Sequence, residues 1–79
     1  MMIREAIAHI AAGATLTTEE AADVMEEIMT GTATPSQIGA FLTALHMRPG
    51  GETVEEIAGL ARVMREKAVQ VHLLSLIHI

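Results

Sequence analysis

Cysteine is absent from this sequence of 79 residues, which excludes disulfides, thiolate catalysis and cysteine-ligated zinc. Tryptophan and tyrosine are also absent, and Phe41 is the single aromatic residue. The apolar content comes instead from alanine, aliphatic residues and six methionines. Such a composition suits helices better than sheet sandwiches, which draw on aromatic and β-branched residues. The scarcity of aromatic residues therefore favours an all-α fold.

Basic residues are also few. Five Lys and Arg residues stand against ten Asp and Glu residues, which gives a formal net charge of −5. A domain that binds the phosphate backbone of a nucleic acid carries a basic patch, so this balance argues against a nucleic-acid partner. Because 51% of the residues are hydrophobic, the chain is too apolar for a disordered protein.

The length corresponds to one small domain. A single core of this size rarely supplies more than roughly 3–5 kcal/mol of stability. We therefore expect the chain to depend on a second copy of itself or on a further part of its own polypeptide. In isolation it is predicted to be unstable as a monomer or to self-associate.

Neither export nor membrane insertion is predicted. The N-terminal segment lacks the apolar region of a signal peptide, because Arg4, Glu5, His9 and Gly13 interrupt it. The longest apolar-rich stretch, Val69–Ile79, is shorter than the roughly 20 residues that a membrane-spanning helix needs. We expect a soluble cytoplasmic protein without a membrane partner.

Helix signals divide the chain into four segments. Ile3, Ile7 and Ile10 recur at i, i+4 and i+7, which predicts a short helix that ends near Gly13. Three capping boxes follow, in which a threonine and a Glu or Gln three positions later bond each other's backbone amides. The boxes pair Thr17 with Glu20, Thr34 with Gln37, and Thr53 with Glu56.

Each box precedes apolar residues at helical spacing, and the connections are short. The sequence therefore predicts a four-helix bundle-like domain over residues 1–71, in which consecutive helices pack as neighbours. Residues 72–79 form an atypical apolar tail. The alternation of residues 69–73 favours a strand, whereas the later spacing favours a helix, and both alternatives stay open at this point.

We predict no catalytic, cofactor-binding or metal-binding residue in this sequence. The four histidines lack the i, i+4 spacing that places two metal ligands on one helix face, so they are interpreted as surface or helix-end residues. They are His9, His46, His72 and His78. Ser36 and Ser75 have no visible base partner for nucleophilic catalysis.

Three further clusters are interpreted structurally. The acidic residues of the segment 19–27 are expected to form a solvated face rather than a metal site. Arg62, Arg65 and Lys67 are expected in the last turns of the fourth helix, where cations suit the helix dipole, rather than in an anion site. Four methionines are expected to fill gaps in the core rather than to form a binding surface. They are Met25, Met29, Met47 and Met64.

The motifs occur in an order that resembles one family over about residues 2–71, the N-terminal helical domain of anthranilate phosphoribosyltransferases. Related pyrimidine nucleoside phosphorylases carry the same helical domain, but the ending Met64-Arg65-Glu66-Lys67-Ala68 favours the anthranilate enzymes. The other motifs are Arg4-Glu5-Ala6-Ile7, Leu16-Thr17-x-Glu19-Glu20-Ala21, Ala33-Thr34-Pro35-x-Gln37-Ile38-x-Ala40-Phe41-Leu42-x-Ala44-Leu45 and Gly51-Glu52-Thr53-Val54-Glu55-Glu56-Ile57-Ala58-Gly59.

The resemblance implies an activity for the complete enzyme. Such enzymes move the phosphoribosyl group of phosphoribosyl pyrophosphate onto the amino group of anthranilate, with Mg²⁺ assisting, in tryptophan biosynthesis. They combine the small helical domain with a larger α/β domain, hold the substrates between the two, and usually form homodimers through the helical domain. The small-molecule substrates and Mg²⁺ are expected only in the full-length enzyme.

The sequence departs from the family in two places. The segment 48–51 lengthens one connection by about two residues, which a surface turn tolerates. The chain also stops before the first α/β strand and the Gly-Thr-Gly-Gly-Asp loop of the family, so we interpret residues 72–79 as a truncated gene end, a frameshift or a read-through artefact. No catalytic position of the family falls on this sequence, and the fragment alone is expected to be inactive.

Only a structural role carries over from the resemblance. The stripe of Ile3, Ile7 and Ile10 and the third helix around Phe41 are candidates for core and dimer packing. Two alternatives remain: the helical domain of a pyrimidine nucleoside phosphorylase, or a stand-alone, non-catalytic helical dimerisation module.

Overall fold

The computed structural model describes the backbone of residues 1–78 and the side chains of residues 1–68. Within residues 1–78 it contains helices and no strand, so the predicted all-α fold is confirmed. The helices are α1 (Ile3–Ala11), α2 (Thr18–Met29), α3 (Pro35–Met47) and α4 (Val54–His78).

The predicted capping boxes begin three of the four helices. At the start of α2, Thr17 Oγ1 accepts a hydrogen bond of 3.1 Å from the Glu20 amide, and the Glu20 carboxylate accepts one of 2.9 Å from the Thr17 amide. These bonds satisfy amides that the first turn of a helix leaves without partners. The same reciprocal bonds join Thr34 to Gln37 and Thr53 to Glu56.

Glycine ends the first two helices as the sequence predicts. Gly13 follows α1 with a φ of 92°, a left-handed conformation that glycine adopts without steric cost. Its amide donates to the Ile10 carbonyl, and the Ala14 amide donates to the His9 carbonyl. This pair of bonds defines a Schellman motif, and Gly31 closes α2 in the same way.

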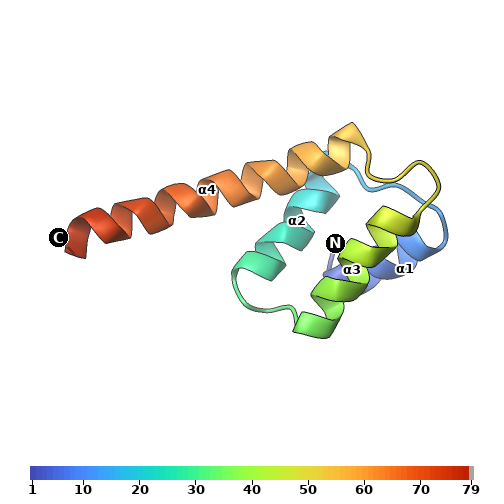
Figure 1. The fold of residues 1–79 in the computed structure, drawn as a ribbon, viewed down its shortest axis with the longest axis horizontal. Helices are drawn as coiled ribbons and strands as arrows, with labels where there is room; N and C mark the ends of the chain where they lie inside the picture. The colour runs from blue at the N-terminus through green and yellow to red at the C-terminus, as the bar shows by residue number, and fades with distance from the viewer. Residues whose placement is uncertain (79) are drawn as a thin grey trace.

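The helices pair differently from the prediction. In Figure 1, α2 lies along the first half of α4, while α3 lies beside α1. Consecutive helices α2 and α3 do not form a major contact, and neither do α3 and α4, so the prediction of sequential neighbours was wrong for both pairs. The connections 30–34 and 48–53 are long enough for each following helix to pack elsewhere than beside the helix that precedes it in the sequence.

The core lies between α1, α2 and α3. Ile3 and Ile10 of α1 are each 1% exposed, and they pack in one cluster with Val24 of α2 and with Phe41 and Leu45 of α3. The predicted role of the α1 stripe and of Phe41 in core packing is therefore confirmed. Because these side chains are buried in the core of the chain itself, they do not form a contact surface for a second copy.

Close contact between α2 and α4 depends on Gly59. A Cβ atom at this position would lie 3.0 Å from Ala21 Cβ and 3.0 Å from the Ala22 amide nitrogen. It would also collide with the Thr18 carbonyl oxygen. Real Cβ atoms rarely approach other atoms so closely, so the two helix backbones can adopt this separation only because residue 59 has no side chain.

Beyond the contact with α2, α4 continues away from the other three helices, as Figure 1 shows. The longest dimension of the molecule is accordingly 47 Å, against 24 and 18 Å in the other two directions. Residues 72–78 extend α4, which decides the open alternative for the tail in favour of a helix. The side chains of residues 69–79 and the backbone of Ile79 lie outside the described part. None of the described helices has the length and hydropathy of a bilayer-spanning segment.

Candidate functional site

A buried ion pair joins the end of α3 to the start of α4. Arg48 is the C-terminal cap of α3, and Glu56 lies in the first turn of α4; they are only 6% and 0% exposed. Arg48 Nη1 donates to Glu56 Oε2 over 2.7 Å, while Nη2 donates to Oε1. Two parallel bonds between a guanidinium and a carboxylate make this the strongest common geometry for such a pair. We refer to it as the Arg48–Glu56 clasp.

The guanidinium also bonds two backbone carbonyls. Arg48 Nη1 donates to the Ala14 carbonyl over 2.9 Å, and Nη2 donates to the Gly51 carbonyl over 2.7 Å. Ala14 lies in the connection between α1 and α2, whereas Gly51 lies in the connection between α3 and α4. Arg48 therefore holds together two loops that are distant from each other in the sequence.

The carboxylate of Glu56 is held by further donors. It accepts bonds of 2.8 Å from the backbone amides of Leu16 and Thr53. Burial alone would raise the pKa of Glu56, but the hydrogen bonds from Arg48, Thr53 and Leu16 outweigh it and lower the pKa to about 2. The same contact raises the pKa of the Arg48 guanidinium. Both groups are thus charged at neutral pH, and Glu56 is not a proton donor there.

The facing atoms of the clasp are bonded within the chain. Among the side chains of residues 1–68, every buried nitrogen or oxygen has a hydrogen-bond partner. Catalytic and binding sites commonly hold polar groups whose bonds are completed by the substrate. Both Nη atoms of Arg48 and both carboxylate oxygens of Glu56 are bonded within the chain, so we interpret the clasp as a structural feature.

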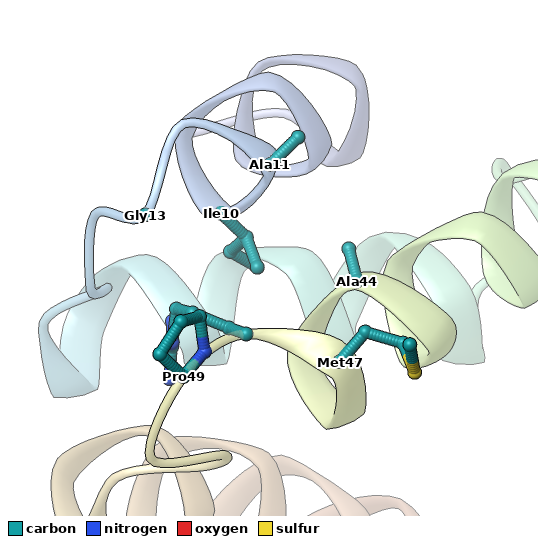
Figure 2. A pocket seen from close by; sticks show the side chains of 7 residues that line it. Ile10, Ala11, Gly13, Ala44, Met47 and Pro49 are labelled. Atoms are coloured by element: carbon teal, nitrogen blue, oxygen red, sulfur yellow. The ribbon is translucent and has the colours of Figure 1, made fainter.

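A shallow apolar hollow lies beside the clasp, between the C-terminal ends of α1 and α3. Its volume is about 290 Å³. Figure 2 shows Ile10 and Ala11 of α1 on one side and Ala44 and Met47 of α3 on the other, with Pro49 closing one end. Apart from Arg48, which the clasp occupies, no charged residue lines it. The lining of the hollow is thus mainly apolar, and Arg48 is its single ionisable residue.

The acidic face of α2 is less solvated than the sequence predicts. Glu27 is half-buried, and its Oε2 accepts a 2.6 Å bond from the Ile3 amide at the start of α1. Ile3 begins α1, where the amides of the first turn lack partners within the helix. The prediction of a wholly solvated face was therefore wrong at this residue, because α1 places its positive end against α2.

Two further carboxylates of α2 pair with cations of α4. Glu19 Oε1 lies 2.9 Å from Arg62 Nη1, and Glu26 Oε1 lies 2.9 Å from Lys67 Nζ. The hydrogen bond from Arg62 lowers the pKa of Glu19. Since α4 continues to His78, these cations lie near its middle. Their predicted position in the last turns was wrong, and pairing with α2 explains them instead.

Most of the methionines do not fill the core. Met25 is 8% exposed and packs beside Val63, as predicted for a gap-filling residue. The prediction was wrong for the other three, because Met29, Met47 and Met64 are exposed by 44%, 73% and 51%. The chain therefore presents several flexible apolar side chains on its surface.

Within the described part of the chain, histidines and carboxylates form no cluster that could bind a metal ion. His9 and His46 are exposed, on different helices. His46 Nδ1 lies 3.9 Å from a Glu52 carboxylate oxygen at the surface. The side chains of His72 and His78 lie outside the described part.

Residues 4–68 match the helical bundle domain of the glycosyl transferase family. The chain belongs to this family. The matched part of the helical bundle domain contains α2, α3 and the whole of the Arg48–Glu56 clasp, together with nearly all of α1. Within α4 the match stops at residue 68, so the rest of the helix lies outside the matched part.

Curated relatives of this helical bundle domain carry the name anthranilate phosphoribosyltransferase. The chain is 69% identical over 72 residues to the protein of that name from Chloroflexus aurantiacus, which covers 91% of this chain and 21% of the relative. For the relative from Roseiflexus castenholzii the identity is 61% over 72 residues, which again make up 91% of this chain and 21% of the relative. For Dehalococcoides mccartyi it is 59% over 70 residues, 89% of this chain and 20% of the relative. The chain thus spans about a fifth of the length of these relatives.

The sequence analysis did not predict the Arg48–Glu56 clasp, although it identified the role of Glu56 in a capping box. The capping box correctly pairs Thr53 with Glu56, but a capping carboxylate is ordinarily solvated. Arg48 was interpreted as part of a surface turn, and only the folded chain brings it to Glu56. Position alone offered one signal: an arginine and a glutamate lie eight residues apart across a Gly-Gly turn, which reverses the chain between them.

Proposed function

We propose that this chain is the N-terminal helical part of an anthranilate phosphoribosyltransferase. The observation that carries the proposal is an identity of 57–69% over 70–72 residues to relatives of that name. The two alternatives, a pyrimidine nucleoside phosphorylase domain and a stand-alone dimerisation module, are less favoured. These relatives are named neither as nucleoside phosphorylases nor as stand-alone modules.

The proposed complete enzyme transfers the phosphoribosyl group of phosphoribosyl pyrophosphate to the amino group of anthranilate. Pyrophosphate leaves in this step, which belongs to tryptophan biosynthesis. The bond to pyrophosphate breaks at the anomeric carbon of the ribose, while the nitrogen of anthranilate forms the new bond there and gives up a proton. We expect this reaction in the cytoplasm.

Within such an enzyme, the described residues act as a framework. Mg²⁺ prefers several oxygen ligands, and the carboxylates of Glu19, Glu26 and Glu56 are already paired with Arg62, Lys67 and Arg48. Within the described part, His, Asp and Glu side chains form no group of three that could hold a metal ion, so we expect no magnesium site there. We place the ligands of Mg²⁺ and both substrates in the remaining four-fifths of the longer polypeptide, and we expect the 79-residue chain alone to be inactive.

We also propose that the complete enzyme is a homodimer that uses the helical domain. Exposed apolar side chains of α3 support this, because Leu42 is 50% exposed and Met47 is 73% exposed. Methionine is among the residues that are enriched at protein–protein interfaces. Since Ile3, Ile10 and Phe41 are buried in the core, Leu42 and Met47 replace them as the candidates for the dimer contact.

A chimera tests the proposed activity directly. The 72 matched residues of this chain replace the corresponding residues of the Chloroflexus aurantiacus relative, and anthranilate consumption is measured with phosphoribosyl pyrophosphate and Mg²⁺. We expect activity close to that of the unmodified relative and none from the 79-residue chain alone. As a matched control, the helical domain of a pyrimidine nucleoside phosphorylase in the same position is expected to give an inactive protein.

The result that contradicts the proposal is equally clear. A chimera that is folded by circular dichroism but inactive, beside an active parent enzyme, means that this helical part does not support the transferase reaction. Sedimentation of the active chimera tests the dimer separately. Replacing Leu42 with Glu is expected to convert a dimer into a monomer, while the exposed Thr43→Glu control leaves it unchanged.

A further inference from the structure

We draw no further inference here: the strongest candidate, the apolar hollow between the C-terminal ends of α1 and α3, carries none, because nothing in the described part of the chain shows what covers it and contact with a second copy there belongs to the dimer already proposed.

Discussion

Arg48 Nη1 lies 2.7 Å from Glu56 Oε2 inside the fold, and the same carboxylate oxygen accepts a bond from the amide of Leu16, forty residues earlier in the chain. A single buried pair thus connects the loop between α1 and α2 to the first turn of α4. Removing one partner of a buried pair leaves the other charge without compensation, which is more damaging than replacing both.

Replacing Arg48 with Met is expected to reduce the free energy of unfolding by about 3–5 kcal/mol, because Glu56 is left as a buried, unpaired carboxylate. That loss is comparable to the whole stability expected of so short a chain, so the variant should be largely unfolded at neutral pH. Urea titration followed by circular dichroism measures the change. Arg65→Met, at an exposed position of α4, is the control and should change stability by less than about 0.5 kcal/mol.

Acid is expected to unfold the chain through Glu56. Its pKa in the folded chain is about 2, against 4.5 for an ordinary glutamate, so its contribution to stability is fully present above pH 4.5. The contribution is lost as the pH falls from 4.5 through 2, and its size is roughly 3 kcal/mol at 1.36 kcal/mol per pH unit.

Urea titrations at several pH values test this dependence. Glu56→Gln should be less stable at neutral pH and should show a shallower loss of stability below pH 4.5. If the variant and the original chain lose stability in parallel over this range, Glu56 is not the group responsible.

Gly59→Ala is expected to destabilise the chain by about 1–3 kcal/mol, because the added methyl group forces α4 away from α2. The direction of this change in stability is informative, because alanine stabilises an isolated helix more than glycine does. Gly39→Ala in α3 is the matched control: its Cβ meets no atom within 4 Å, so it should stabilise the chain by about 0.5–1 kcal/mol. Thermal unfolding of the two variants should therefore shift in opposite directions, and a shift in the same direction contradicts the proposed packing.

Met25→Ala and Met47→Ala are expected to differ in stability although both remove the same atoms. Met25 is 8% exposed, so its truncation leaves a cavity and lowers the free energy of unfolding by about 2–5 kcal/mol. Met47 is 73% exposed, and its truncation should change the value by less than about 0.5 kcal/mol. Equal effects in urea titration would show that the core does not end where the structure places it.

Local features of the fold could be predicted from the sequence, whereas the contacts between segments could not. The boxes at Thr17, Thr34 and Thr53 and the left-handed glycines act within one helical turn, so their neighbours in the sequence determine them. The pairing of α2 with α4 depends on Gly59, whose missing side chain looks like a weakness when the helix is considered alone. The exposed methionines were mispredicted because helical spacing identifies apolar stripes, but it does not reveal which stripe the rest of the chain covers.

The absence of catalytic residues in this chain was also a prediction from the sequence, and it stays a prediction. What supports it in the described part is that both Nη atoms of Arg48 and both carboxylate oxygens of Glu56 are bonded within the chain. Sequence spacing could not show this, because the Leu16 amide and the Ala14 carbonyl that complete these bonds come from the opposite end of the domain.

The clasp also determines where the chain can be cut without loss of the fold. A piece that ends before Glu56 keeps α1, α2 and α3 but leaves the guanidinium of Arg48 without its carboxylate and the amide of Leu16 without its acceptor. The first turn of α4 is therefore an integral part of the three-helix core. The shortest autonomous unit must extend past this turn, and a protease that cleaves the Gly50–Gly51 turn should release no stable three-helix product.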